Sequence, residues 1–365
     1  MIISINRSVS SHVHLISISD GRHYDDGDNY SCHTNAGLAV VANTAFKNGI
    51  LTVASAGNDP DPANQCTVSA PAQAPGALAV GGIGDGTELS ANDWNDADLF
   101  SLTSHGPDNY YGLRWRTVID SVAPAYFRYY PSYSVDSGVN GYNTLNPPGG
   151  GTSYAQPLVA SALVDSIHYM LEVKDDSLFL LPGVQKAYML EMGDRANGQV
   201  YGYNFYWGAG RTRVRRFDDV GMDAPWGRLS GYVCVGDSDE VIVEVKNGQL
   251  LSEAVDRLKA SIWWFTDSYS NPVPNDIDLY LQRSTNGTTW TTIRSDTGSD
   301  LKKRVYYTPM GGYYARLKIV GTQVNGSHND NGACSSGQAR VYFIWIYEDD
   351  ARDDYNGPGE EIGQL

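Results

Sequence analysis

Apolar and polar residues follow two different patterns along the chain, and the change falls near residue 228. Before that point, short unbroken apolar runs at 14–19 and 50–55 flank a segment, 34–47, whose apolar residues recur at helical spacing. Unbroken apolar runs are typical of strands that are buried on both faces of a sheet. Strand, helix and strand in this order predict a βαβ unit with parallel strands. The fold class expected for residues 1–228 is therefore α/β.

A second helix is expected after three consecutive glycines, with an apolar face that runs from Ala155 to Met170. Ser153 stands before this face, and Gln156 follows it at the spacing of a capping box. Pro157 then falls in the first turn, where its missing N–H is not needed. The ordinary role of such a serine is that of an N-cap. The same position puts a hydroxyl near the positive end of a helix dipole, beside N–H groups that can hold a developing oxyanion.

Beyond residue 228 the pattern becomes short alternating runs separated by polar turns, which predicts an antiparallel β-sandwich, specifically a jelly roll, over 229–348. The tail, 349–365, is acidic and contains Gly and Pro, so we expect it to be disordered. The eight expected strands are 231–235, 240–245, 258–266, 276–282, 289–294, 304–308, 313–320 and 340–347.

The net negative charge of the chain argues against polyanionic partners. The 365 residues carry a formal net charge of -16, and the isoelectric point is about 4.7. Nucleic acids and anionic membranes attract basic surfaces, so neither is an expected partner. No stretch has the length of a transmembrane helix, and the N-terminus shows no basic region followed by an apolar one.

Four cysteines allow three pairings. Cys32 and Cys66 lie in the first part of the chain, whereas Cys234 and Cys334 lie in the last. One disulfide in each part, Cys32–Cys66 and Cys234–Cys334, is the simplest arrangement. No Cys/His spacing suggests zinc, and free buried thiols are the main alternative.

The segment GGGTSYAQP resembles the G-T-S-x-A-x-P nucleophile segment of the subtilisin-like serine proteases, the subtilases or S8-type peptidases. The resemblance continues in LTVASAGND, in SAPA, in SHGP and in VIDSVAP, where Ala125 replaces the glycine that ends the family's pattern. It ends with GAGRTRV, so that it covers roughly 15–217. It implies a subtilisin-like α/β domain, and the strands after it resemble the β-sandwich appended to some extracellular subtilases.

By this resemblance Ser153 is the nucleophile, and Asn58 supplies the oxyanion hole together with the Ser153 N–H. Taken by itself, an asparagine in this place is more often an ordinary turn residue after a strand. The resemblance also implies which residues line the substrate cleft: Ser19, Asp20, Gly21, Ser55, Ala56 and Gly57.

The family's remaining catalytic groups have no match. A subtilase carries its Asp in a D-[ST]-G segment and its His in an H-G-T-H helix start, both upstream of the strand at 14–19, and neither motif occurs in the chain. None of the histidines considered as substitutes has the family's helix context; these are His12, His14, His23, His33, His105 and His168. An N-terminally truncated sequence, a degenerate subtilase and complementation by a separate polypeptide are the three explanations. The chain by itself is expected to be nearly inactive.

The expected function is that of a secreted subtilisin-like serine endopeptidase acting on proteins or peptides, without a cofactor. Asp276 and Asp278 are weak candidates for Ca²⁺, since two carboxylates spaced two apart on a strand more often belong to its solvated face. The alternative function is a non-catalytic protein that binds protein or glycan surfaces, with Trp263, Trp264 and Trp290 as contacts. Core packing is the more ordinary role of tryptophans within strands.

Overall fold

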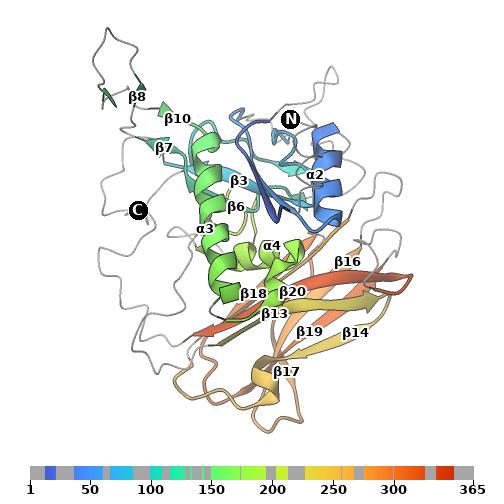
Figure 1. Cartoon of the computed structure of the whole chain (residues 1–365). Helices are drawn as coiled ribbons and strands as arrows, with labels where there is room; N and C mark the ends of the chain where they lie inside the picture. Colours follow the sequence, from blue (N-terminus) through green and yellow to red (C-terminus); the bar gives the residue numbers. More distant parts are fainter. Residues whose placement is uncertain are drawn as a thin grey trace.

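The computed structural model (Figure 1) shows two regions, an α/β domain and an antiparallel β-sandwich. It describes residues 13–21, 37–60, 66–84, 99–108, 116–127, 132–133, 142–143, 149–172, 174–194, 203–212, 227–255, 257–266, 275–298, 300–324 and 334–348.

The α/β domain is built on a six-stranded sheet whose first five strands run parallel. In sheet order these strands are β1 (Leu15–Ile18), β2 (Leu51–Ser55), β3 (Ala77–Ile83), β6 (Ser121–Pro124), β12 (Arg211–Thr212) and the antiparallel β11 (Gly193–Asp194). β2 is buried at every residue, as its apolar run predicts, and so is β3. For β1 the prediction of a buried strand is wrong except at Ile18, because β1 lies at the edge of the described sheet. The predicted βαβ unit is confirmed.

In the described ranges, the helices that accompany this sheet are α2 (Gly37–Lys47), α3 (Thr152–Glu172) and α4 (Pro182–Glu191). α2 joins β1 to β2, and α3 packs against β1, β2, β3 and β6. Short elements complete the domain; they are β4 (Pro107–Asp108), β5 (Arg116–Thr117), β7 (Tyr126–Phe127), β8 (Ser132–Tyr133), β9 (Tyr142–Asn143), β10 (Gly149–Gly150) and the 3₁₀ turn η3 (Ser177–Leu180).

The C-terminal region is a jelly roll of two four-stranded antiparallel sheets. All eight predicted strands are present: β13 (Gly227–Gly236), β14 (Glu240–Glu244), β15 (Arg257–Trp264), β16 (Asp276–Ser284), β17 (Thr291–Asp296), β18 (Lys302–Tyr307), β19 (Tyr314–Gln323) and β20 (Gln338–Glu348), with the turn η4 (Val245–Gly248) after β14. The sheet orders are β13-β20-β15-β18 and β14-β19-β16-β17. Taken in order along the chain, these strands are 1-8-3-6 and 2-7-4-5, the double Greek key of a jelly roll.

The predicted disulfide between Cys234 and Cys334 is present and ties the end of β13 to the segment before β20. Cys66 is also disulfide-bonded. Its expected partner, Cys32, lies outside the described residues, as does the tail at 349–365.

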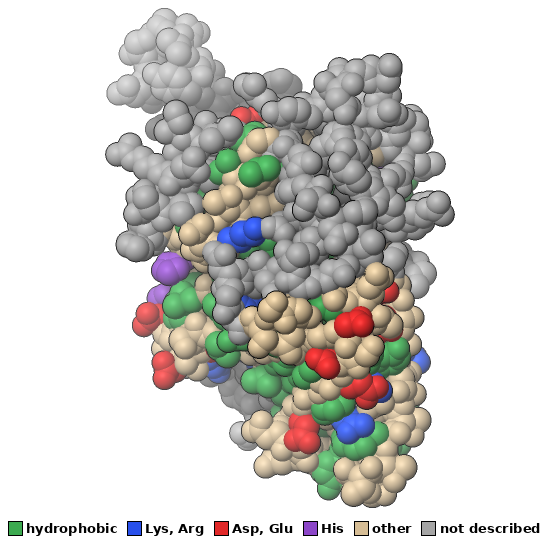
Figure 2. Space-filling model, turned by 90° about the vertical axis from the view of Figure 1, so that its right-hand side faces the viewer, with side chains coloured by type: hydrophobic (Ala, Val, Ile, Leu, Met, Phe, Trp, Pro, Cys, Tyr) green, Lys and Arg blue, Asp and Glu red, His purple; other side chains and the backbone are tan. Residues whose placement is uncertain are grey.

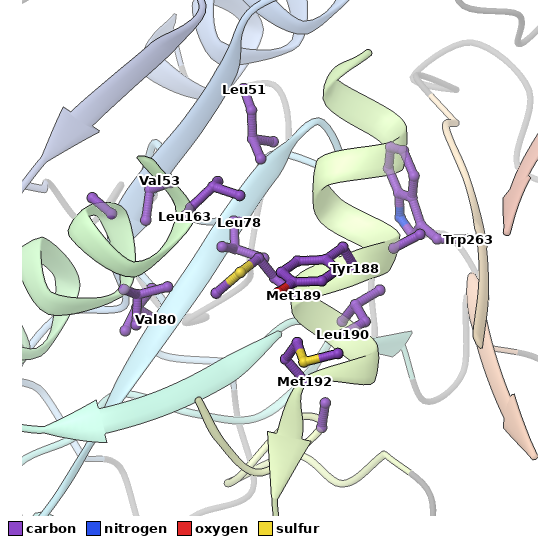
Figure 3. Close-up of a cluster of buried hydrophobic side chains, with 14 of the residues drawn as sticks. Leu51, Val53, Leu78, Val80, Leu163, Tyr188, Met189, Leu190, Met192 and Trp263 are labelled. Carbon is purple, nitrogen blue, oxygen red and sulfur yellow. The ribbon is translucent and has the colours of Figure 1, made fainter. Parts of the chain in front are cut away.

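Helix α4 connects the two regions. Every residue of α4 is buried, because the helix packs on β2 of the α/β sheet and on β13, β15 and β20 of the jelly roll. In Figure 3 its side chains Tyr188 and Met189 lie between Leu78 of β3 and Trp263 of β15. One hydrophobic core therefore runs through both regions.

Buried charges reinforce this junction. Asp120, just before β6, forms an ion pair with Lys186 of α4 at 3.0 Å and accepts a hydrogen bond from Lys302 of β18 at 2.7 Å. Arg304 of β18 donates to the main-chain oxygens of Ala209, Glu191 and Gly193 at 2.7–2.9 Å. The jelly roll thus contacts the α/β domain at the amino end of β6 and leaves the opposite edge of the sheet uncovered by it (Figure 1).

The surface carries exposed acidic side chains, whereas the charges of the junction are buried in ion pairs. Figure 2 shows acidic side chains spread over the lower part of one face, the part that the jelly roll occupies, with hydrophobic side chains scattered among them. Exposed hydrophobic side chains such as Val40, Ile242 and Leu250 belong to different elements, which is normal for a protein surface. Among the described helices, none combines the length and the apolar character that a membrane crossing needs.

Candidate active site

The candidate site lies at the carboxyl ends of β1 and β2. Parallel strands bring their carboxyl ends to the same edge of a sheet, and α/β proteins commonly bind ligands there. Ser19 follows β1, Asn58 follows β2, and the first turn of α3 begins beside them at Thr152. Residues separated by more than a hundred positions therefore meet at one place.

Ser153 is half-buried in the first turn of α3, and its Oγ donates a hydrogen bond to the Ser19 carbonyl oxygen at 2.8 Å. The interpretation of Ser153 as an N-cap is wrong, because the helix already begins at Thr152. Pro157 consequently stands inside the helix, past its first turn. Within the described part of the chain, neither a histidine nor a carboxylate contacts the Ser153 hydroxyl.

Asn58 is exposed, but its side-chain amide is held in one orientation. Its Oδ1 accepts hydrogen bonds from the Thr152 N–H at 2.8 Å and from the Thr152 Oγ1 at 3.1 Å. An amide turned the other way would place its NH₂ group against the Thr152 N–H, so the bond identifies Oδ1. The Nδ2 donor is left free of Thr152, beside the backbone of Gly151, where an added Cβ would lie 3.2 Å from it.

Gln156, the expected capping-box partner of Ser153, has a different role. Its side chain is fully buried, and Nε2 donates to the Val53 carbonyl oxygen and to Ser17 Oγ, both at 2.9 Å. Its Oε1 accepts from Ser19 Oγ at 2.7 Å. The capping-box prediction is wrong because these contacts between α3 and the ends of β1 and β2 use the whole amide. Gln156 fixes the helix that carries Ser153 to the strands.

The other predicted cleft residues differ in accessibility. Ser19 and Asp20 are exposed, and Gly21 and Gly57 are half-buried. Ser55 and Ala56 are buried in the sheet, where the Ala56 N–H donates to the Val80 carbonyl oxygen. The residues that sequence reasoning missed are Thr152 and Gln156. Both stand inside the quoted GGGTSYAQP segment, but nothing in the sequence shows that their side chains reach β1 and β2.

The histidines weighed as a catalytic base are spread over the molecule. His14 is exposed just before β1, and His168 is exposed four turns along α3 from Ser153. The His105 ring packs against Tyr206 with 4.5 Å between ring centroids. His12, His23 and His33 lie outside the described residues.

The candidate calcium ligands Asp276 and Asp278 lie on β16 of the jelly roll. Asp278 is buried and accepts a hydrogen bond from the Tyr280 hydroxyl at 3.0 Å, so the expectation of a solvated strand face is wrong there. Burial raises the pKa of Asp276, a shift that the charge of Lys303 opposes and that of Asp278 increases. No group of three or more His, Cys, Asp and Glu side chains that could hold a metal occurs within the described ranges. The calcium interpretation stays a prediction.

The tryptophans are placed by packing. Trp263 and Trp264 are 2% and 0% exposed, so neither is available as a surface contact. Trp263 packs on Phe46 of α2 with 5.1 Å between ring centroids, across the junction of the two regions. Trp290 is half-buried, and the Arg316 guanidinium lies over its ring at 4.2 Å.

The fold and the site together define an α/β protein with polar side chains gathered at the carboxyl edge of a parallel sheet, joined to a jelly roll. Residues 1–172 match the model of the Subtilase family. Over these residues, which make up somewhat less than half of the chain, the α/β domain therefore resembles the Subtilase family.

The chain also matches several solved structures at low sequence identity. Sphericase is 20% identical, with a TM-score of 0.40 over 59% of this chain and 63% of its own. The S41 psychrophilic protease is 16% identical, with a TM-score of 0.40 over the same shares. Tripeptidyl peptidase 2 is 13% identical, with a TM-score of 0.37 over 95% of this chain and 36% of its own. The chain thus spans less than two thirds of each. Among curated proteins, none matches.

Proposed function

We propose that the protein is a serine endopeptidase of the subtilisin type, with Ser153 as the nucleophile and Asn58 in the oxyanion hole. The observation that carries the proposal is the bond between Asn58 and Thr152, because it holds an exposed amide donor next to the residue that bears the hydroxyl. The proposal also includes the domain limits 1–228, 229–348 and 349–365.

In the proposed reaction, Ser153 Oγ forms a bond to the carbonyl carbon of a peptide, and the oxygen of that carbonyl becomes negative. Asn58 Nδ2 and the Ser153 N–H donate to this oxygen, and the N-terminal end of the α3 dipole adds favourable potential. The hydroxyl proton passes to a base, which returns it to the amine as the C–N bond breaks. Water then releases the acyl group from Ser153.

The base is the missing part of this scheme among the described residues. Subtilisin that has lost its Ser or its His loses about 2 × 10⁶ in kcat, yet retains about 10³ to 10⁴ over water from the oxyanion hole and binding. A chain that contributes only Ser153 and Asn58 is therefore expected to hydrolyse activated esters slowly and peptides hardly at all.

A p-nitrophenyl ester of a short peptide tests the proposal on the full chain. We expect hydrolysis above the buffer rate, and Asn58→Leu should lower it about 100-fold, as loss of an oxyanion donor does. Ser153→Ala should abolish covalent labelling by a fluorophosphonate probe, however weak that labelling is. The matched control is Ser161→Ala, an exposed serine of the same helix, which should change neither measurement. Unchanged hydrolysis in Asn58→Leu would overturn the proposal.

The proposed substrates are extracellular proteins or peptides, and the proposed location is outside the cell. The family match and the acidic surface support both statements. The alternative of a binding protein that uses aromatic contacts loses its main support, because Trp263 and Trp264 are buried.

A further inference from the structure

Ser104 is a fully buried serine in the S-H-G-P segment, and its hydroxyl reaches the turn that carries Asn58. Its Oγ accepts a hydrogen bond from the Asp59 N–H at 3.0 Å and donates to the Asp59 carbonyl oxygen at 3.3 Å. Its own N–H donates to the Gly57 carbonyl oxygen at 3.0 Å. The residues before and after Asn58 are therefore both bonded to Ser104.

The segment that bears Ser104 is itself anchored. The His105 N–H donates to Thr67 Oγ1 at 3.1 Å, and the Thr67 N–H donates back to the His105 carbonyl oxygen at 2.9 Å. Ser69 Oγ, two residues further along, donates to the Ala56 carbonyl oxygen at 3.1 Å. One side of the turn at 56–59 is thus bonded to the buried hydroxyls of Ser69 and Ser104, whose two segments are bonded to each other.

The opposite side of the turn is held by Thr152, whose Oγ1 accepts from the Gly57 N–H at 3.1 Å. Gly57 has φ +111°, which L side chains rarely adopt, and an added Cβ there would lie 2.8 Å from Ser104 Oγ. The backbone therefore has little room to shift between Ser104 and Thr152.

We infer that Ser104 is a positioning residue for Asn58 in the proposed oxyanion hole. An oxyanion donor is effective when it is aimed before the charge develops, so that nothing has to reorganise during the reaction. Asn58 is exposed, and its amide is oriented by Thr152 only if the main chain on both sides of Asn58 stays in place. Ser104 supplies the rigidity from inside the protein, through the main chain on both sides of Asn58. This inference rests on the proposed function.

The test compares Ser104→Ala with Asn58→Leu in the full chain, using the p-nitrophenyl peptide ester. Ser104→Ala leaves the Asp59 N–H without its acceptor but keeps the main-chain bond to Gly57. We expect kcat to fall about tenfold with KM unchanged, since the loss concerns the transition state only. In the double variant, Ser104→Ala should cost nothing beyond the loss already caused by Asn58→Leu.

The matched control is Ser166→Ala. Ser166 is a buried serine of α3 whose Oγ donates to the Ala162 carbonyl oxygen at 2.7 Å, away from the turn. It should lower stability as Ser104→Ala does, without the loss in kcat. A spectroscopic measurement accompanies the kinetics: Ser104→Ala should shift the side-chain amide resonances of Asn58 and speed hydrogen exchange at the Asp59 amide. If Ser104→Ala does not fold, Ser104→Cys keeps the volume and a weak hydrogen-bonding group, and a smaller loss is expected.

The outcomes separate the two proposals. If Asn58→Leu has no effect, the proposed function fails. If Asn58→Leu lowers hydrolysis but Ser104→Ala leaves kcat and the Asn58 resonances unchanged, the proposed function stands and the role of Ser104 is wrong. An undiminished loss from Ser104→Ala in the Asn58→Leu background would also contradict that role, because Ser104 would then act on something other than Asn58.

Discussion

The two edges of the parallel sheet are built from different chemistry. At the carboxyl edge, the neutral groups Ser153, Asn58 and Gln156 each hydrogen-bond to a neighbouring element, and the Asn58 side chain is exposed. At the amino end of β6, Asp120 and two lysines are buried with about 3% of each side chain exposed. A buried charge is stable only if paired, whereas a neutral hydroxyl can remain half-open. The buried ion pairs at the charged edge connect the two regions, whereas at the neutral edge the Ser153 hydroxyl and the Asn58 amide remain accessible.

The charged edge should be the more sensitive of the two to substitution. Asp120→Ala leaves Lys186 and Lys302 buried without their common counter-charge, so we expect a loss of about 3–5 kcal/mol in the free energy of unfolding. Urea denaturation measures it, with Asp165→Ala on the exposed face of α3 as the control, expected within about 0.5 kcal/mol of the parent. A loss below about 1 kcal/mol would show that the charges do not fasten the regions.

At the neutral edge, Gln156→Leu should cost about 1–3 kcal/mol, because it removes the buried bond to the Val53 carbonyl oxygen and the bonds to the Ser17 and Ser19 hydroxyls. It should also lower ester hydrolysis, since α3 is no longer fixed to β1 and β2. Gln185→Leu is the matched control in α4, where a buried amide donates to the Phe179 carbonyl oxygen. That variant should lose similar stability and keep its hydrolysis. Equal hydrolysis in both variants would contradict the assignment of the site to this edge.

A smaller effect is expected at Thr152, whose hydroxyl is one of two donors to Asn58 Oδ1. Thr152→Val keeps the shape and the N–H bond but removes the hydroxyl, so kcat for the ester should fall about tenfold, or about 1.4 kcal/mol. Thr103→Val serves for comparison, because Thr103 Oγ1 accepts from the Gly82 N–H inside the same sheet. A fall of the same size in both variants would mean that the Thr152 hydroxyl does not act by orienting the Asn58 amide.

The smallest expected difference between the two edges is in the pH dependence of stability, to which Asp120 of the charged edge contributes. Burial raises the pKa of Asp120, but the charges of Lys186 and Lys302, the hydrogen bond from Lys302 and that from the Ala79 N–H outweigh it and leave the pKa below its usual value. A lowered pKa contributes stability above the unfolded value of about 4 and loses it as the pH falls through the folded value. Urea midpoints should therefore lose the Asp120 contribution only below about pH 4. Asp120→Asn should lack this part of the acid loss, and an identical acid profile would contradict the assignment.

The hydrophobic pattern predicted many of the elements, but it did not predict α4. Unbroken apolar runs predicted β1 and β2, helical spacing predicted α2, and alternation predicted all eight jelly-roll strands, because these periods reflect local geometry. The pairing of Cys234 with Cys334 also followed from their positions in the chain. By contrast, the capping box at Ser153 was wrong. The spacing of Ser153 and Gln156 is correct for a helix start, but the Gln156 side chain instead forms hydrogen bonds with Val53 of β2 and with Ser19 after β1.

The sequence by itself determined β1, β2, α2, most of α3, the eight jelly-roll strands and the resemblance of the first region to subtilases, since all of these depend on residues close together in the chain. Only the tertiary structure decided that Asn58 is oriented by Thr152, that its neighbour Asp59 is bonded to Ser104, and that Asp120 joins α4 to β18. Such contacts connect residues tens to more than a hundred and fifty positions apart. No local pattern encodes them, because hydrogen bonds and ion pairs of this kind exist only after the strands have set the distance between their partners.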